Sequence, residues 1–317
     1  MNPLAKLIGG TVLLIVGVTM GLFWLAKESE PNSQNASVKE SNDSNPTSSL
    51  SEVLTPIQAI SHVHGLAVDV ADASRLYLAT HEGLAVLKND TELYRIGDNR
   101  SDLMGFSIHP KDAKMFFSSG HPPTGGNLGF QKSTDGGMTW KKISGGVRGV
   151  ADFHAMSVSL VNPDIVYGLD EGRLQRSMDG GKKWEMVKNT LPQVISLVSC
   201  TQNESMVYAA TVNGLYRSVD QGETWANLSE NLSGAAVVSV AMSPRDSMKL
   251  ISFSEKLGMA RSDDGGVTWQ KMEGALNGEI VMNLAIDGGN PEIAYAATRG
   301  NSLYKSVDNG VTWNKIR

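Results

Sequence analysis

Histidine has the widest chemical repertoire in this chain, since a neutral imidazole can bind transition metals, exchange protons near neutral pH and form hydrogen bonds. All six histidines lie between residues 62 and 154: His62, His64, His81, His109, His121 and His154. Acidic residues and methionines are interspersed with them. This stretch can form a binding or metal site only if the fold brings the rings together.

Recurring apolar segments indicate how the fold arranges these histidines. Six segments of a similar pattern start at Leu76, Met115, Val166, Val207, Leu250 and Ala294, and the last reads Ala-Tyr-Ala-Ala-Thr. Each follows another short segment in which apolar and polar residues alternate, such as Leu66-Ala-Val-Asp. Such segments predict pairs of short β-strands, which we call the first and second strands of each unit.

A second motif follows these strands five times from residue 133 onward. It has the form Ser-x-Asp-x-Gly-x-x-Trp, and its tryptophans are spaced by 44, 41, 44 and 44 residues. The five copies contain the pairs Asp135 and Trp140, Asp179 and Trp184, Asp220 and Trp225, Asp264 and Trp269, and Asp308 and Trp313. A period of 40–45 residues with several short strands per unit is typical of propeller blades.

These octads resemble the Asp-box, or BNR repeat, of sialidases, sortilin-type receptors and related bacterial propellers, many of which are labelled glycosyl hydrolases. The resemblance covers about residues 60–317. It implies that each box is the hairpin between the third and fourth strands of a blade, where Asp and Ser bond the turn backbone and Trp packs between blades. Because one turn repeated around a ring cannot be a single active site, we interpret the boxes as structural.

The count of units predicts an all-β, six-bladed β-propeller over residues 56–317, with a seven-bladed ring as the alternative. The first blade has no recognisable box, since Lys88-Asn89-Asp90 is followed almost directly by the next strand at Glu92. Residues 60–317 allow about 43 residues per blade, as the period requires. The segment 54–60 is a candidate for an additional strand that latches the ring.

First strands begin, and second strands end, at one face of a propeller, which we call the mouth. Counting thirteen residues back from aligned second-strand positions gives His64, Met104, His154, Ile195, Ser239 and Met282. The second-strand ends align as His81, His121, Glu171, Val212, Lys256 and Arg299, and His62 precedes His64 by two residues. An insertion at 121–130 lengthens a loop on the same face. We therefore predict a ligand site made by His62, His64, His81, His121, His154 and Arg299.

Four of these histidines are also candidate metal ligands. His64, His81, His121 and His154 would bind zinc or copper, with His62, Met104 or Glu171 completing the set, and a methionine sulfur would favour reduced copper. Without a diagnostic local spacing, a purely structural role for the histidines is the competing hypothesis.

Catalysis is the alternative function. Sialidases, whose Asp-boxes these octads resemble, have an Arg-Ile-Pro motif, an arginine triad and a Tyr nucleophile, whereas this chain has only Arg95-Ile96-Gly97 and one arginine at the mouth. Another glycoside hydrolase needs two carboxylates about 5–10 Å apart. The candidates are Glu82, Asp152, Asp170 and Glu171. We favour a binding module for a glycan, a small molecule or a protein over an enzyme.

The N-terminus predicts attachment to a membrane. Residues 7–26 are twenty uncharged, mostly apolar residues, enough to cross about 30 Å of hydrocarbon as a helix. We expect an uncleaved anchor over residues 1–27, and Lys6 before the span places the N-terminus in the cytoplasm. Residues 28–55 are rich in Ser and Asn and predict a disordered linker. The propeller would then be extracytoplasmic on a single-pass cell-membrane protein; the alternative is secretion after signal cleavage.

The composition of the chain argues against several other kinds of partner and site. The net charge is −5 and no basic tract follows the N-terminus, which argues against nucleic acid as a partner. Cys200 is the only cysteine, so an intrachain disulfide and a cysteine-rich zinc site are excluded.

Overall fold

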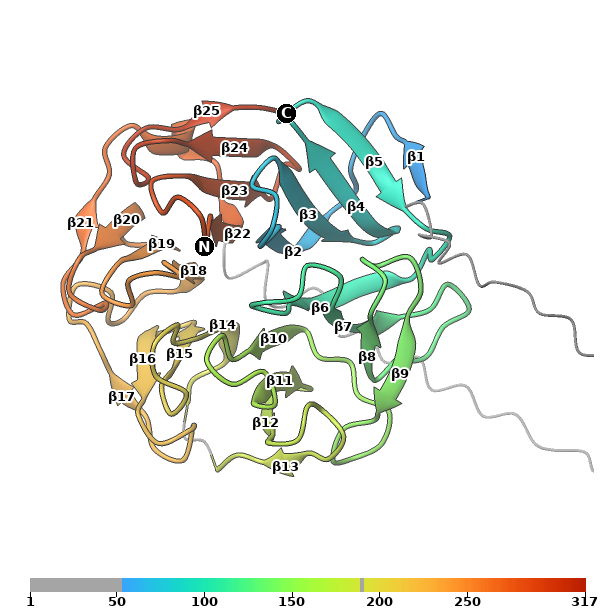
Figure 1. Cartoon of the computed structure of the whole chain (residues 1–317). Coiled ribbons are helices and arrows are strands. Elements are labelled where there is room, and N and C mark those ends of the chain that lie inside the picture. The colour runs from blue at the N-terminus through green and yellow to red at the C-terminus, as the bar shows by residue number, and fades with distance from the viewer. Residues whose placement is uncertain (1–52, 189–190) are drawn as a thin grey trace, which may run out of the picture. The chain divides into compact units, whose positions relative to one another are not determined.

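The computed structural model describes residues 53–188 and 191–317, and this part of the chain is built almost entirely of strands. They form six antiparallel sheets arranged as blades around a central channel (Figure 1). The one helical element described is a single 3-10 turn, Ala275–Gly278. The predicted six-bladed β-propeller is confirmed, and the described residues contain no seventh blade.

The inner two strands of each blade fall where the apolar segments predict them. The first strands are β2 (Val63–Val68), β6 (Asp102–Ile108), β10 (Ala155–Val158), β14 (Val194–Ser199), β18 (Val237–Met242) and β22 (Val281–Ile286). The second strands are β3 (Arg75–Thr80), β7 (Phe116–His121), β11 (Val166–Asp170), β15 (Val207–Thr211), β19 (Leu250–Ser254) and β23 (Ala294–Thr298). Second strands such as β15 and β23 are buried along their whole length, which explains their continuous apolar sequence.

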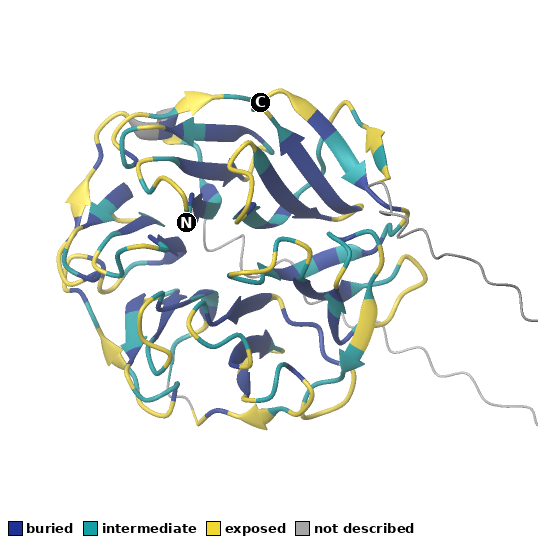
Figure 2. Ribbon diagram, viewed as in Figure 1, coloured by how far each residue is buried: buried dark blue, intermediate teal, exposed yellow. Residues whose placement is uncertain are grey.

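The outer two strands complete each blade. The third strands are β4 (Gly83–Lys88), β8 (Phe130–Ser133), β12 (Arg173–Ser177), β16 (Gly214–Ser218), β20 (Gly258–Ser262) and β24 (Leu303–Ser306). The fourth strands are β5 (Glu92–Ile96), β9 (Lys141–Ser144), β13 (Glu185–Met186), β17 (Ala226–Asn227), β21 (Gln270–Lys271) and β25 (Asn314–Lys315). Figure 2 shows the burial falling from the inner strands to these exposed outer edges.

The predicted N-terminal anchor and all but the last residues of the predicted linker lie outside the described residues. In the part of the chain that the structure describes, no helix has the length and apolar character needed to cross a bilayer. A strand β1 (Leu54–Pro56) begins inside the predicted linker and pairs with β5 as the fifth strand of blade one.

Each Asp-box closes its own turn with side-chain hydrogen bonds. In blade four, the Ser218 hydroxyl donates to Asp220 Oδ1 (2.7 Å) and accepts the backbone N–H of Gly222 (2.7 Å). Asp220 also accepts the backbone N–H (2.9 Å) and the hydroxyl (2.6 Å) of Thr224. Equivalent bonds recur at Asp135, Asp264 and Asp308. The box carboxylates are therefore occupied within their own turns.

The box tryptophans pack at the outer part of the blades. The Nε1–H of Trp269 donates to the Gly266 carbonyl at 2.9 Å, and its ring is buried. Trp184 instead reaches blade two, where its Nε1–H donates to Ser144 Oγ at 2.9 Å and its ring lies against Phe130, with a centroid distance of 5.4 Å.

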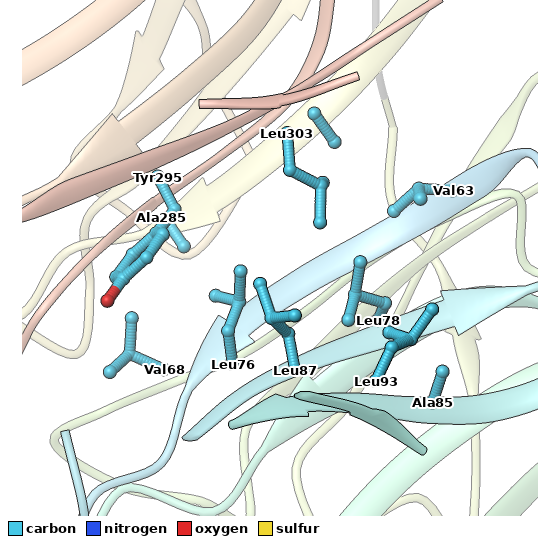
Figure 3. Close-up of a cluster of buried hydrophobic side chains, with 11 residues drawn as sticks. Val63, Val68, Leu76, Leu78, Ala85, Leu87, Leu93, Ala285, Tyr295 and Leu303 are labelled. Carbon is cyan, nitrogen blue, oxygen red and sulfur yellow. The ribbon is translucent and has the colours of Figure 1, made fainter. Parts of the chain in front are cut away.

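The ring closes between blades six and one without exchange of a strand. A cluster of buried apolar side chains from β2–β5 and β22–β24 fills this boundary (Figure 3). Lys305 Nζ is 2.7 Å from Asp90 Oδ2, and the Arg317 guanidinium donates to the carbonyls of Gln58 (2.7 Å) and Thr91 (3.1 Å). The segment proposed as a latch thus joins blade one through β1 and contacts blade six through the C-terminal residue.

Candidate ligand site at the channel mouth

A cavity of about 590 Å³ occupies the centre of the ring and is lined by all six first strands. Its lining runs from His62, His64 and Met104 at the mouth to Pro110 and Lys111 at the opposite end of the same strands. All six first-strand positions derived from the sequence, among them His154 and Met282, line this cavity.

β-Bulges determine which residues face the mouth. In β2, Val63 pairs with Thr80 and Gly65 with Ala79, so that His64 is the extra residue of a bulge. Bulges also occur near the starts of β6, β14, β18 and β22. A bulge redirects a side chain at the edge of a sheet, as is common beside binding sites.

The bulge in blade five corrects one alignment. Val237 pairs with Ser254 and Ser239 with Phe253, so the residue equivalent to His64 is Val238 rather than Ser239. The second-strand end is correspondingly Glu255 rather than Lys256, and its backbone N–H donates to the Ala236 carbonyl. The alignment shifts by one residue here because the segment starting at Leu250 has no aromatic residue at the position where four other blades have a tyrosine and blade two has Phe117.

The first His–Asp cluster, which we define as His64, His81 and Asp102, joins blades one and two. His81 Nδ1 lies 2.7 Å from Asp102 Oδ2 and 3.3 Å from His64 Nε2. His64 Nε2 is also 3.3 Å from Asp102 Oδ1. The ring of His62 lies beside this cluster, with centroids 4.9 Å from His64 and 5.7 Å from His81.

The backbone of blade two holds Asp102 in position. Asp102 is the cross-strand partner of His121, and Leu103 is the partner of Gly120. Gly120 has a φ of 137°, and a Cβ atom at this position would lie 1.9 Å from the Asp102 carbonyl oxygen. Only glycine permits this approach of the two strands.

The second His–Asp cluster, which we define as His121, Asp152 and His154, joins blades two and three. His121 Nε2 is 2.8 Å from Asp152 Oδ2, and His154 Nε2 contacts the same oxygen. His121 Nδ1 is 3.0 Å from the Gly126 carbonyl in the inserted loop. The Asp152 side chain is 7% exposed, and its Oδ1 atom is buried without a hydrogen-bond partner.

A short segment at 150–153 places Asp152 against blade two. Its bonds to that blade are Asn127 Nδ2–H to the Val150 carbonyl (2.9 Å), Gly129 N–H to the Ala151 carbonyl (3.0 Å) and Phe153 N–H to Ser119 Oγ (2.9 Å). In addition, the Asp152 backbone N–H donates to Asp170 Oδ1 at 3.0 Å. The insertion predicted from the sequence is therefore part of the site's framework.

The site's electrostatics follow from these contacts. The hydrogen bond to Asp152 raises the pKa of His154, whereas burial and the neighbouring His64 lower the pKa of His62. Burial opposes ionisation of Asp102, but the hydrogen bonds from His64 and His81 outweigh it and lower the pKa of this carboxyl. Burial raises the pKa of Asp170.

Other predicted site residues lie outside the two clusters. Glu171, with 71% of its side chain exposed, pairs with Arg173 at 3.0 Å, and Glu82 pairs with Arg95 at the same distance. Met104 lines the cavity, and Arg299 is exposed but close enough to His62 to lower its pKa electrostatically. Among the described residues, the potential metal-binding groups contain Asp102 and Asp152, and neither contains Glu171.

The sequence interpretation missed the pairing of these two aspartates with the histidines, although a signal for it was present. His62 lies two residues before the aligned position His64. The same offset from Met104 and His154 gives Asp102 and Asp152. Three equivalent positions of neighbouring blades thus provide polar groups to the mouth.

Comparison with known proteins supports the assignment of the repeats. The BNR/Asp-box repeat family model matches residues 260–271. The chain is a six-bladed propeller with Asp-box repeats. A second family model, described as photosynthesis system II assembly factor YCF48, matches residues 123–256 of this Asp-box propeller, from the loop after β7 to the turn after β19. A search of the curated proteins finds no match.

Solved structures with this fold belong to very different proteins. An ancestral GH74 enzyme is 18% identical with a TM-score of 0.57, and the alignment covers 83% of this chain and 40% of the enzyme. The GH74 xyloglucanase from Xanthomonas campestris is 17% identical with a TM-score of 0.53, covering 80% and 47%. The outer coat vertex of COPII on membranes is 13% identical with a TM-score of 0.59, covering 79% and 70%. The Asp-box propeller spans less than half the length of these GH74 enzymes, and the likeness shows the fold alone.

Proposed function

We propose that this chain is a membrane-tethered, extracytoplasmic binding module that takes a segment of a partner protein at the mouth over blades one to three. The observation that carries the proposal is the gathering of five histidines and two aspartates at one end of an open channel. The propeller fold itself does not require these groups, since blades four to six have Ile195, Val238 and Met282 at the positions equivalent to His64.

The shape of the mouth suits a polypeptide. The cavity of about 590 Å³ lies within the range of ligand pockets, and it is lined both by apolar side chains such as Leu66 and Leu284 and by polar ones. His81 and His154 are about half exposed at its rim, and Thr124 projects from the inserted loop. Loops on a rigid scaffold are common places for recognition.

The family match supports a protein as the partner. The YCF48 model is described as an assembly factor, and assembly factors act on other proteins. Its matched segment, residues 123–256, includes most of the inserted loop, Asp152 and His154. The tether is supported by the uncharged run at residues 7–26, which would hold the propeller next to partners at the membrane.

The test is site-specific crosslinking in cells of the source organism. A photoreactive amino acid would replace Thr124 or Arg148 at the mouth, and as matched controls Val219 or Val307, both exposed in Asp-box turns. We expect one protein adduct common to both mouth positions and absent from both controls. Equal adducts from the two sets, or none from the mouth, would contradict the proposal.

A glycoside hydrolase is the second candidate because burial raises the pKa of Asp170, as a general acid requires. The contacts of the neighbouring carboxylates argue against it, since Asp152 is held by two histidines and Glu171 by arginine. Hydrolysis of a panel of aryl glycosides, including a sialoside, by the propeller tests this candidate. Turnover that is abolished by Asp170→Asn would place the enzyme first.

A further inference from the structure

The hydrogen-bond pattern around His121 leaves an unmatched pair of acceptors. Its Nδ1 atom faces the Gly126 carbonyl, which can only accept, so Nδ1 carries the proton. In a neutral imidazole the Nε2 atom then has a lone pair and no hydrogen. This lone pair faces Asp152 Oδ2 at 2.8 Å, and a carboxylate oxygen also only accepts. Either a proton on Nε2, which makes the ring an imidazolium, or a metal ion bound to both atoms resolves the conflict.

The partners of Asp152 reinforce this need for positive charge. The same Oδ2 atom is contacted by Nε2 of His154, and the Oδ1 atom is buried with no hydrogen-bond partner. A buried carboxylate oxygen without a partner carries a desolvation cost that a bound ion removes. Donation of the His121 Nδ1–H to a carbonyl is also the usual way in which a protein orients a metal-binding imidazole.

The first cluster has the spacing of a metal site as well. Ligands about 2.1 Å from a tetrahedral ion lie about 3.4 Å from one another. The three contacts among His64, His81 and Asp102 measure 2.7, 3.3 and 3.3 Å. In each cluster, the three ligand atoms all lie within 4.8 Å of one another.

The two clusters are neighbours on one sheet. Asp102 of the first and His121 of the second are directly opposite each other in the β6–β7 pair, where Cα atoms are about 4.5–5.5 Å apart. Asp102 also acts electrostatically on His154. The mouth therefore presents two sets of ligands side by side rather than a single set drawn from four histidines.

We propose that the mouth binds two divalent transition-metal ions, one in each His–Asp cluster. Two imidazoles and one carboxylate suit zinc, copper, nickel or cobalt, and they do not suit magnesium or calcium, which prefer oxygen ligands alone. Three protein ligands leave at least one coordination position open, as in catalytic rather than structural zinc sites. His81, His121 and His154 are 40–53% exposed, so these positions face the solvent of the mouth.

The experiment uses the propeller alone, residues 50–317, which forms a compact unit with its own closed ring of strands. The protein is stripped with a chelator, loaded with Zn²⁺ or Co²⁺, desalted at pH 7.5 and measured by elemental analysis. We expect two equivalents per chain. His81→Gln and His154→Gln should each retain one equivalent, and the double variant none.

The matched control is His109→Gln, because His109 lies at the other end of its strand, outside both clusters, and its Nδ1 accepts the Lys111 backbone N–H. This variant should retain two equivalents, and circular dichroism should show that all variants are folded. Anomalous diffraction from a zinc-loaded crystal gives an independent readout, with one peak expected in each cluster.

Three results would overturn the proposal: no retained metal in the wild type, a single equivalent, or two equivalents that survive the double substitution. Absence of metal would make the clusters imidazolium–carboxylate ion pairs. None of these results bears on the crosslinking at Thr124, so the partner proposal is tested separately.

Discussion

At the scale of single residues, this chain uses aspartate in two opposite ways. In a box aspartate such as Asp220, both carboxylate oxygens accept hydrogen bonds from backbone and hydroxyl groups of the same turn. Asp152 is buried, contacts two imidazoles through one oxygen and leaves the other without a partner. The first arrangement is complete by itself, whereas the second leaves a buried acceptor without a hydrogen-bond partner.

The box arrangement predicts a specific acid dependence. Hydrogen bonds from Thr224 lower the pKa of Asp220 to about 2, below its unfolded value of about 3.9. A lowered pKa gives stability that is complete above the unfolded value and is lost as the pH falls toward 2. We expect Asp220→Asn to lower the melting temperature at pH 7, and the difference from wild type to shrink between pH 4 and pH 2.

Melting curves of the propeller at several pH values measure this difference. Asp98→Asn is the control, since the Asp98 side chain is 97% exposed. A difference between Asp220→Asn and wild type that stays constant down to pH 2 would show that the carboxylate contributes nothing in its ionised form.

At the scale of elements, the Asp-box hairpins hold the outer strands, and the bulged first strands build the mouth. The fourth strands β13, β17, β21 and β25 are only two residues long, so their attachment depends on the preceding box turn and its tryptophan. The mouth depends instead on close contacts between neighbouring first and second strands, such as that of Gly120 with Asp102.

The tryptophans should differ in their contribution to stability according to burial. Trp269 is buried in the core between blades four and five, whereas Trp225 is only partly buried. Trp269→Ala should therefore lower the free energy of unfolding by about 3–5 kcal/mol. Trp225→Ala should cost clearly less. Urea denaturation of both variants measures the two free energies of unfolding. Equal losses of this free energy would contradict the dependence on burial.

Glycine substitutions separate local backbone strain from damage to the site. Gly120 and Gly125 both have positive φ, but a Cβ on Gly120 meets the Asp102 carbonyl whereas nothing lies within 4 Å of one on Gly125. Gly125→Ala should cost about 1–2 kcal/mol through strain alone. Gly120→Ala should cost more and should also abolish metal retention by the first cluster, which holds Asp102. Unchanged metal content in folded Gly120→Ala would refute this positioning role.

At the scale of the whole molecule, the ring closes through side chains rather than a shared strand. The apolar cluster between blades six and one, the Lys305–Asp90 ion pair and the contacts of Arg317 join the two ends of the chain. These contacts between the two ends of the ring all involve residues from Ile57 onward.

The tether should therefore be separable from the propeller. We expect the full-length protein to remain in membranes after a carbonate wash, and protease added to intact cells to release a folded fragment cut within residues 28–52. Immunoblotting of the membrane and soluble fractions checks both results. A soluble form beginning near Lys27 without added protease would instead show that the apolar run is a cleaved signal.

The fold could be predicted from the sequence because its determinants are local. The box bonds join residues two to four positions apart, as from Ser218 to Asp220 and Gly222, and the apolar pattern of a strand is visible within five or six residues. These signals recur with a constant period, so six blades follow without knowledge of any distant contact. The same period placed all five histidines of the mouth on one face.

The pairing within the site depended on tertiary structure. His81 meets Asp102 and His121 meets Asp152 across blade boundaries, through contacts between residues 21 and 31 positions apart. Whether such side chains touch depends on the approach allowed by Gly120 and on the segment at 150–153, which are not part of the repeated motif. In blade five the residue equivalent to His64 is Val238 rather than Ser239, and such a difference matters because a shift of one residue reverses the face of a strand. The sequence thus determined the scaffold and the face of the site, whereas packing between blades decided which groups meet there.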